Sequence, residues 1–273
     1  FFTKDGFMEQ DKNLNLEFWD SVVSTHMQSD YYDLDGFLKG KSALDSVEVD
    51  VVGDVSGKEL LHLQCHFGLG TFSWERKGAI ATGLDFSPVA IKAAKELANK
   101  YSYQSDFVLS NVYDLSTNVD RTFDIVFTSY GVLCWLDDLE EWARQIYLSL
   151  RKGGSFHIVE YHPLLTALTK GNSGEIIIRN QYFNEGVEVI DVQGSYASGV
   201  QVKNLKTYEW AHSLAEILQA LIDAGLTIIS FKEYEHARDA GFVGYLEKST
   251  NRTWKIPDQK WKVPLSFSIS AIK

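Results

Sequence analysis

The sequence predicts an α/β fold in which a doubly wound, mostly parallel sheet is covered by helices on both faces. From about residue 58 onward, short apolar runs alternate with segments of helical period. This alternation is typical of βαβ units, whose strands are buried on both faces. The 273 residues include only 4 prolines, and 45% are hydrophobic, which is an ordinary globular balance with enough apolar residues for a sizeable core.

The first two parts of the chain differ in texture. Residues 1–56 mix a helical stretch, 14–25, with polar, turn-rich pieces, and we expect them to form an N-terminal cover. Residues 57–161 are expected to be the ligand-binding core, with strands over 59–65, 79–85, 107–110, 123–130 and 155–161. One helix begins at Ser87 and Pro88, which suit an N-cap and a first turn. A second helix covers 138–150, with Gly153 and Gly154 as helix stop and turn.

The alternation stops after residue 161. Glycines punctuate residues 162–207 and separate β-like runs at 175–178 and 187–192, which indicates an inserted lid. Residues 208–273 are expected to complete the core sheet. They contain an amphipathic helix over 213–224, ended by Gly225, then a strand over 226–231 and a last strand over 265–272.

Charge and cysteine content exclude several classes of function. The formal net charge of −11 argues against a sequence-independent grip on nucleic acid. The two cysteines, Cys65 and Cys134, form no CxxC pair, so neither a disulfide scaffold nor a thiolate zinc site is expected. The near-apolar stretch 123–136 is interrupted by polar residues and is shorter than the roughly 20 residues that a membrane span needs. We expect a soluble, cytoplasmic protein without a signal peptide or a membrane partner.

A glycine-containing loop and an acidic residue mark a candidate ligand site. The apolar strand 59–65 runs into a loop with Gly68 and Gly70, and a helix follows. Glycines let a ligand approach the backbone closely, and a helix N-terminus offers free N–H groups. Asp85 ends the second strand, where a carboxylate can accept hydrogen bonds from two ribose hydroxyls. The pattern predicts a nucleoside-containing ligand at the carboxyl edge of the sheet; the alternative is an ordinary βα turn with a solvent-facing Asp85.

Four motifs resemble the sheet motifs of class I S-adenosylmethionine-dependent methyltransferases: LHLQCHFG at 61–68, GLDFS at 83–87, FDIVF at 123–127 and KGG at 152–154. The resemblance covers roughly residues 58–161, and the strands at 226–231 and 265–272 fit the closing antiparallel hairpin of that family. It implies a Rossmann-like, seven-stranded sheet with an antiparallel last strand, and S-adenosyl-L-methionine as the cofactor.

The same resemblance implies which residues bind the cofactor. Gly68 and its loop would lie against the methionine part, Asp85 would hold the ribose, and Asn111 would bond the adenine amino group. The whole set at the sheet edge is Gln64, His66, Gly68, Asp85, Phe86, Asn111, Val112 and Ser129. The family's first-strand acid is replaced by His62 here, and its first two glycines are replaced by Gln64 and His66. These departures leave open how the methionine end is held.

Aromatic residues of the N-terminal cover are further candidates. Aromatic faces suit a sulfonium cation, so Trp19 is expected to cover the cofactor together with Phe18, Tyr31 and Tyr32. Ordinary helix packing of Phe18 and Trp19 is the alternative. No metal site is expected, because His62 and His66 span a strand and a loop without a third ligand.

In the family's architecture, the ends of strands four and five face the cofactor methyl group. The resemblance therefore nominates Tyr130, Glu160 and His162 as catalytic residues. His162 is the preferred base because an imidazole titrates near neutral pH, although it can also serve as a turn cap before Pro163. Glu160 has a structural alternative as well. The expected acceptor pocket consists of Tyr130, Trp135, Tyr161 and Trp210.

The sequence thus predicts a methyltransferase that acts on a small-molecule acceptor, and it does not define which atom is methylated. Two alternatives stay open. Gly68, Gly70 and Ser73 approximate a dinucleotide fingerprint, which would suit an NAD-dependent oxidoreductase. A non-catalytic cofactor-binding protein of the same fold is the other alternative. The β-like runs of the lid leave room for a homodimer.

Overall fold

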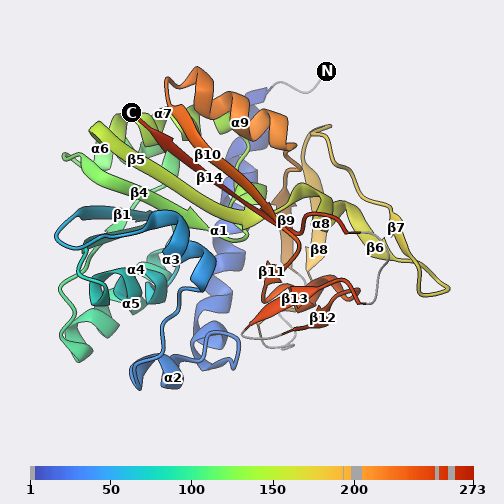
Figure 1. Ribbon diagram of the computed structural model, residues 1–273, viewed down its shortest axis with the longest axis horizontal. Helices are drawn as coiled ribbons and strands as arrows, with labels where there is room; N and C mark the ends of the chain where they lie inside the picture. Colours follow the sequence, from blue (N-terminus) through green and yellow to red (C-terminus); the bar gives the residue numbers. More distant parts are fainter. Residues whose placement is uncertain (1–3, 193, 198–204, 250–251, 258–261) are drawn as a thin grey trace.

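A seven-stranded sheet forms the centre of the computed structural model, which describes residues 4–192, 194–197, 205–249, 252–257 and 262–273 (Figure 1). The strand order is β10-β14-β5-β4-β1-β2-β3. The strands are β1 (Glu59–Leu63), β2 (Ile80–Asp85), β3 (Asp106–Leu109), β4 (Phe123–Ser129), β5 (Leu150–Tyr161), β10 (Thr227–Tyr234) and β14 (Ser266–Ile272). Only β14 runs antiparallel to its neighbours, β5 and β10. The predicted fold class is confirmed.

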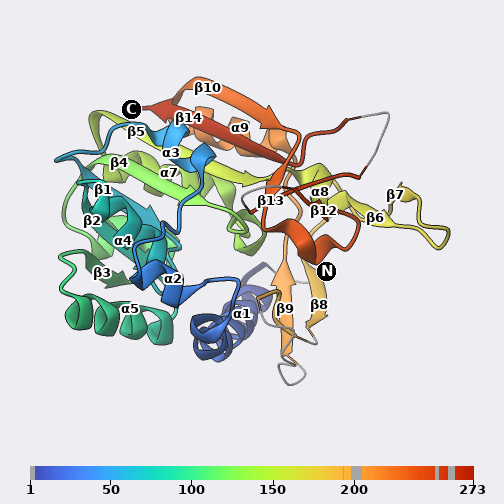
Figure 2. The ribbon, with the colours of Figure 1, turned by 60° about the horizontal axis from the view of Figure 1, so that its bottom comes forward.

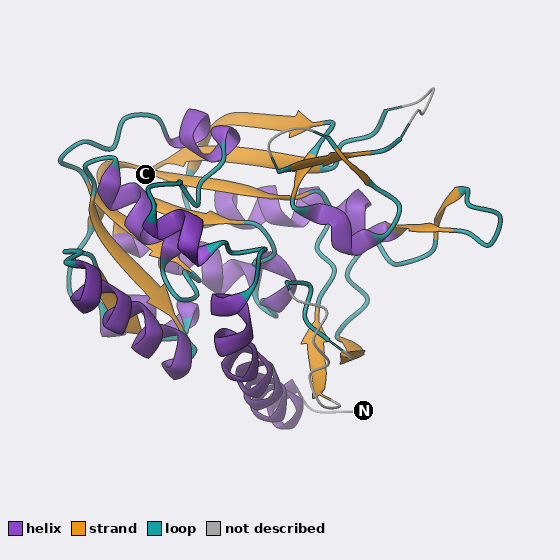
Figure 3. Ribbon diagram, turned by 90° about the horizontal axis from the view of Figure 1, so that it is seen from below, coloured by secondary structure: helices purple, strands orange, loops and turns teal. Residues whose placement is uncertain are grey.

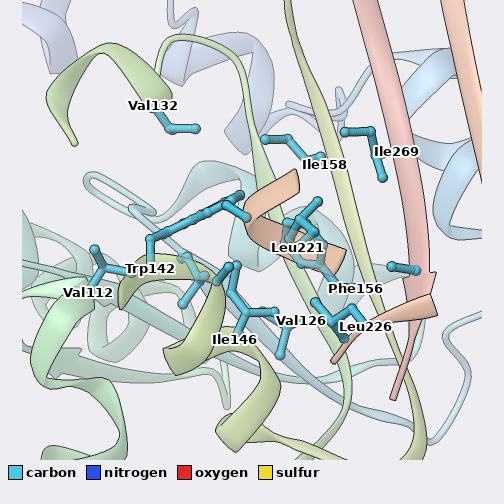
Figure 4. Packing of buried hydrophobic residues seen from close by; sticks show 14 of the residues in the cluster. Val112, Val126, Val132, Trp142, Ile146, Phe156, Ile158, Leu221, Leu226 and Ile269 are labelled. Carbon is cyan, nitrogen blue, oxygen red and sulfur yellow. The ribbon is translucent and has the colours of Figure 1, made fainter. Parts of the chain in front are cut away.

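Helices cover both faces of the sheet (Figure 3). One face packs against α3 (Ser46–Val52), α4 (Leu69–Arg76) and α5 (Pro88–Tyr101). The other face packs against α6 (Leu115–Asn118), α7 (Leu139–Ser149) and α9 (Leu214–Asp223). Successive strand residues point to opposite faces, so Leu60 packs with the first group and Leu61 with the second. On the second face, Trp142 of α7 and Leu221 of α9 pack against Phe156 of β5 (Figure 4).

One predicted boundary is wrong. Helix α7 ends at Ser149 and β5 begins at the next residue, so Gly153 and Gly154 lie inside a strand and not in a turn. The reason is a bulge: Leu150 pairs with Phe123, but the next pair joins Ser155 to Ile125. Gly153 has a φ of 78°, which a glycine adopts without strain, and this lets the extra residues loop out of the ladder.

The N-terminal segment contains α1 (Lys4–Gln28) and α2 (Leu34–Leu38). The helix α1 extends beyond the predicted range and lies beside β9 (Leu205–Glu209) (Figure 2). The side-chain amide of Asn15 donates to the backbone carbonyl of Tyr208, and its oxygen accepts from the backbone N–H of the same residue, both at 2.9 Å. This two-way contact attaches α1 to β9 much as a neighbouring strand would.

The described part of the predicted lid region, 162–192, 194–197 and 205–207, consists of short elements. They are α8 (Pro163–Ala167), β6 (Leu168–Lys170), β7 (Ile176–Ile178) and β8 (Glu188–Val192). Strands β6 and β7 form one hairpin, and β8 pairs with β9. A small sheet that the sequence did not indicate, β11 (Ala237–Arg238), β13 (Thr253–Lys255) and β12 (Glu247–Lys248), lies between β10 and β14 in the chain. No helix of the described ranges is long and apolar enough to cross a membrane.

Candidate functional site at the carboxyl edge of the sheet

A cavity of about 240 Å³ lies at the carboxyl edge of the sheet, beyond the ends of β1, β2, β4 and β5. Phe18, expected beside Trp19 in the cover, packs against Trp19 and Trp135 and is not among the described lining residues. The lining does include the other residues that the sequence predicts for the cofactor site and the acceptor pocket: Trp19, Tyr31, Tyr32, Gln64, His66, Gly68, Asp85, Phe86, Asn111, Val112, Ser129, Tyr130, Trp135, Tyr161 and Trp210. The structure therefore brings these side chains together, while their individual roles stay predictions. The topology explains the grouping, because parallel strands end at one edge of a sheet.

The loop between β1 and α4 has an unusual backbone. Gln64 and His66 have φ values of 51° and 52°, and Gly68 has 88°, so all three are left-handed. A Cβ on Gly68 would come within 2.7 Å of the Phe107 ring. This glycine therefore serves both the turn and the close packing of the loop on β3. Non-glycine residues in this conformation store strain that their surroundings must offset.

Asp85 holds that loop in place. One carboxylate oxygen accepts from the backbone N–H of His66 at 2.8 Å, and the other accepts from the backbone N–H of Ser87 at 2.9 Å. Burial raises the pKa of Asp85 to about 6, because the charged form is removed from water. The carboxylate lies in the cavity lining and at the same time ties β2 to the β1–α4 loop.

His62, which stands where the family usually has an acid, is buried under α4. Its Nδ1 lies 2.9 Å from Thr71 Oγ1, and its ring contacts Phe127. Burial lowers the pKa of His62 to about 3, so the ring is neutral at pH 7. A Cβ on Gly70 would come within 2.7 Å of this ring, which is why the helix can pass so close. The cavity lining at the end of β1 thus contains a neutral ring in place of a carboxylate.

An aromatic and histidine cluster closes the side of the cavity next to α1. His26 Nδ1 lies 2.9 Å from His66 Nε2, and His26 Nε2 lies 2.6 Å from Ser195 Oγ. The Trp19 ring packs edge-on against His66, with ring centroids 5.4 Å apart. Burial lowers the pKa of His26 to about 4 and that of His66 well below its usual range. Trp19 was predicted here; His26 was missed, although it lies two turns after Trp19 on the same helix face.

A second polar cluster, also missed from the sequence, lies on the opposite wall. The guanidinium of Arg238 donates to Glu48 Oε2 at 2.7 Å, and the same oxygen accepts from the backbone N–H of Asp45. The hydroxyl of Tyr130 donates to Asp45 Oδ2 at 2.8 Å, and that of Tyr161 donates to the Arg238 carbonyl at 2.7 Å. Burial raises the pKa of Glu48 to about 7, while the Arg238 charge works in the opposite direction. The Asp45-x-x-Glu48 capping box can be recognised in the sequence, but a capping box alone indicates only that a helix starts there.

The three predicted catalytic residues separate in the structure. Tyr130 lines the cavity, but neither Glu160 nor His162 is among the described residues that do so. The Glu160 carboxylate accepts from the backbone N–H groups of Gly131 and Val132 at 2.6 and 2.8 Å, and so shapes the loop after β4. His162 is the N-cap of α8: its Nδ1 accepts from the Leu164 N–H, and its Nε2 contacts Glu233.

A second and more open hollow, the outer hollow, adjoins the cavity. The two share five lining residues: Tyr31, Tyr32, Ala43, Tyr196 and Arg252. The hydroxyls of Tyr32 and Tyr196 lie 2.6 Å apart, and Arg252 is held by Asp239. Within the described ranges, no group of three or more His, Cys, Asp or Glu side chains is arranged to hold a metal ion.

Comparison with known proteins assigns the core. Residues 61–156 match a family described as "Methyltransferase domain". Ubiquinone biosynthesis O-methyltransferase of Xanthomonas oryzae pv. oryzae is 33% identical over 131 residues, which are 47% of this chain and 54% of that protein. The chain thus spans about half the length of the curated relatives that it matches.

Two solved structures share the fold over most of the chain. A putative S-adenosylmethionine-dependent methyltransferase of Listeria monocytogenes aligns with a TM-score of 0.59 and 21% identity, over 82% of this chain and 94% of that one. An S-adenosylmethionine-dependent methyltransferase of Mesorhizobium loti gives 0.59 and 18%, over 86% and 100%. Residues 61–156 thus resemble a methyltransferase domain, and the chain shares the fold of S-adenosylmethionine-dependent methyltransferases.

Proposed function

We propose that this protein transfers a methyl group from S-adenosylmethionine to a small-molecule acceptor. The observation that carries the proposal is the cavity at the carboxyl edge of the sheet, which gathers the predicted cofactor residues inside a methyltransferase domain. The methyl group of this cofactor is already activated as a sulfonium, so the main task of the protein is to hold the acceptor in line with it.

The cofactor would lie along the ends of β1, β2 and β4. In this proposal the β1–α4 loop contacts the methionine part, Asp85 binds the ribose and Asn111 lies at the adenine. Gln64 supports the loop, because its side-chain amide donates to the Val132 carbonyl at 3.1 Å. Trp19 and the neutral His66 would cover the methionine end, where an aromatic face attracts a cation.

The acceptor would occupy the wall formed by Tyr130, Trp135, Tyr161 and Trp210. The named relatives are O-methyltransferases, which favours a hydroxyl acceptor. A hydroxyl must lose its proton as its oxygen bonds to the methyl carbon and the carbon–sulfur bond breaks. Glu48 is our candidate for the group that takes this proton, because it lies in the cavity and its pKa is raised to about 7.

The outer hollow offers a route for the acceptor. It opens beside Tyr31, Tyr196 and Arg252, which also line the inner cavity. An acceptor longer than one ring would extend through this gap. The acidic net charge of −11 argues against bulk RNA or DNA as the acceptor. The free Cys65 and Cys134 suit the proposed cytoplasmic location, and the predicted homodimer belongs to the same proposal.

Calorimetric titration with S-adenosylmethionine, S-adenosylhomocysteine and NADH in parallel tests the cofactor. We expect micromolar binding of both adenosyl compounds and no heat from NADH. Binding of NADH alone would replace the proposal with a nicotinamide-dependent oxidoreductase. Transfer of a labelled methyl group to a panel of phenols, carboxylic acids and amines, with tRNA as the contrasting acceptor, then tests the acceptor class. Cofactor binding without transfer to any of them would favour the non-catalytic alternative.

A further inference from the structure

A short hairpin projects from the body of the protein (Figures 1 and 2). It consists of β6 and β7, joined by a turn at 171–175. Its apolar side chains are unusually open to solvent for a strand: Ile177 is 39% exposed and Ile178 is 73% exposed. Phe183, which follows the hairpin, is 68% exposed. Ile176 packs against the cluster around Leu165, so Ile177 and Ile178 are the exposed apolar residues of this strand. Exposed apolar side chains on a strand with a free edge are typical of an interaction site.

One edge of β7 is unpaired within the described ranges. The sheet that contains β7 has two strands, and only β6 pairs with β7. The Gly171 N–H donates to the Glu175 carbonyl, and the Arg179 N–H donates to the Ala167 carbonyl. Main-chain groups alternate in direction along an antiparallel pair, so those of Ile177 also face β6. The main-chain groups of Ile176 and Ile178 therefore point outward, toward the open edge.

The sequence of this strand complements itself. Residues 175–179 read Glu-Ile-Ile-Ile-Arg, so the segment has opposite charges at its two ends and Ile177 at its centre. If a second copy of the strand lies antiparallel along the open edge, Ile177 falls opposite itself. Glu175 then falls opposite Arg179 of the partner subunit, and the reverse pair forms across the two-fold axis. Opposite charges that face each other across a strand pair are stabilising, and like charges are not.

The hydrogen-bond pattern agrees with this register. Ile176 would exchange main-chain hydrogen bonds with Ile178 of the partner subunit, since the main-chain N–H and C=O groups of both residues face outward. Ile177 and the charged pairs would occupy the positions without hydrogen bonds, where facing side chains come closer together. Within the described part of the chain, neither Glu175 nor Arg179 forms an ion pair in its own copy. Arg179 is therefore available to a partner, whereas Glu175 has to exchange its hydrogen bond from the Ser173 N–H, at 2.9 Å, for the partner's Arg179.

We propose that β7 pairs antiparallel with β7 of a second copy of this chain, forming a four-stranded intermolecular sheet with Glu175–Arg179 ion pairs on both sides of the axis. A lipid surface is the competing occupant for exposed isoleucines. The charges of segment 163–192 disfavour it, since two are basic and four are acidic: Lys170, Arg179, Glu175, Glu185, Glu188 and Asp191. A contact limited to two short hairpins is smaller than an obligate interface, so the dimer is expected to depend on protein concentration.

A charge swap within one chain tests the pairing by sedimentation velocity over a wide range of protein concentrations. The wild type should move from monomer to dimer as concentration rises. Arg179→Glu and Glu175→Arg should each shift this transition at least tenfold upward, because like charges then face each other. The double variant Glu175→Arg/Arg179→Glu restores opposite charges and should return the transition to near the wild-type concentration. Dimers that are equally stable in all four proteins would place the interface elsewhere and overturn the proposal.

Cross-linking tests the register independently of dimer strength. Ile177→Cys puts two thiols opposite each other at the axis, so mild oxidation should give a covalent dimer. Thr169→Cys, on the other strand of the hairpin, is the matched control and should give far less. A wild type that stays monomeric, together with an Ile177→Cys variant that does not cross-link, would overturn the proposal. Binding of that monomer to vesicles of neutral phospholipid would assign the hairpin to a membrane surface instead.

Discussion

The backbone N–H of His66 donates to the Asp85 carboxylate at 2.8 Å, so the acid at the end of β2 fixes the loop that follows β1. The residue expected to bind the ribose is thus also the residue that shapes the loop expected to bind the methionine. Asp85 therefore links the two halves of the proposed cofactor site, and its removal should affect both.

We expect Asp85→Ala to weaken S-adenosylmethionine binding by roughly 1–3 kcal/mol, because it removes a carboxylate from ribose hydroxyls and releases the loop. Calorimetric titration of the folded variant measures this. Asp85→Asn is the matched control: it keeps an oxygen that can accept from the His66 N–H, so it should lose less. Unchanged affinity in both variants would move the ribose site away from Asp85.

Glu48→Gln should lower turnover by about 10²–10⁴-fold while leaving cofactor affinity nearly unchanged, if Glu48 takes the acceptor proton. A base must be deprotonated, so wild-type turnover should rise with pH through about 7, the raised pKa of Glu48. The variant should lose this limb of the pH profile. The control is Glu59→Gln, which also removes a carboxylate from an arginine pair but lies at the start of β1. A pH limb that persists in Glu48→Gln would exclude this role.

His162→Ala should act on stability rather than on turnover. The ring caps α8 and does not line the cavity, and loss of an N-cap costs about 1 kcal/mol of unfolding free energy. His162→Asn can still cap the helix and should recover most of that loss. Urea unfolding and initial rates of methyl transfer separate the two effects. A large fall in turnover with unchanged stability would restore His162 as the base.

Gly68→Ala tests the close packing of the β1–α4 loop. Gly68 has φ 88° and ψ 6°, and Gly244 has nearly the same conformation, φ 75° and ψ −8°, but open space where a Cβ would stand. Gly244→Ala should therefore cost only the left-handed strain, roughly 1–2 kcal/mol. Gly68→Ala should cost about 1–3 kcal/mol more, since its Cβ meets the Phe107 ring. Equal losses of unfolding free energy in the two variants would show that the Phe107 ring moves aside at no cost in stability.

The sheet was predictable because each strand can be recognised in the local sequence, as a short apolar run followed by a turn or a helix. Gly68 and Asp85 could be picked out for the same reason, since Asp85 ends one such strand and Gly68 lies in the loop that follows another. His162 shows the limit of this reasoning: its place after β5 was right, but its ring turns toward the Leu164 N–H and away from the cavity. The side-chain direction depends on a cap that forms only in the folded chain.

The walls of the cavity were harder to predict, because they come from segments whose position depends on long-range packing. Glu48 belongs to the cover segment and Arg238 to the small sheet near the C-terminus, and nothing in either local sequence indicates that they meet. His26 is similar, since its partners come from the β1–α4 loop and from Ser195. Their contacts are separated by 40 to 190 residues along the chain.

The buried His26 predicts acid sensitivity of the fold. Burial lowers its pKa to about 4 in the folded protein, below the 6.5 of a solvent-exposed histidine, so folding favours the neutral ring. The stabilisation is complete above pH 6.5 and is lost as the pH falls toward 4, because the unfolded chain then binds a proton that the folded chain excludes. His26 alone should contribute a loss of about 3 kcal/mol across this window.

Urea unfolding at intervals between pH 7 and pH 4 measures this loss. His26→Gln removes the titrating ring while keeping a hydrogen-bonding side chain, so its unfolding free energy should fall less steeply with acid than that of the wild type. The same substitution at His236, a half-buried histidine that does not line the cavity, is the control for loss of a histidine elsewhere in the fold. If the wild type and His26→Gln show the same slope, His26 takes up its proton in the folded protein over the same pH range as in the unfolded chain. The hydrogen bond between His26 and His66 would then join a charged ring to a neutral one, directly behind the cavity that His66 lines.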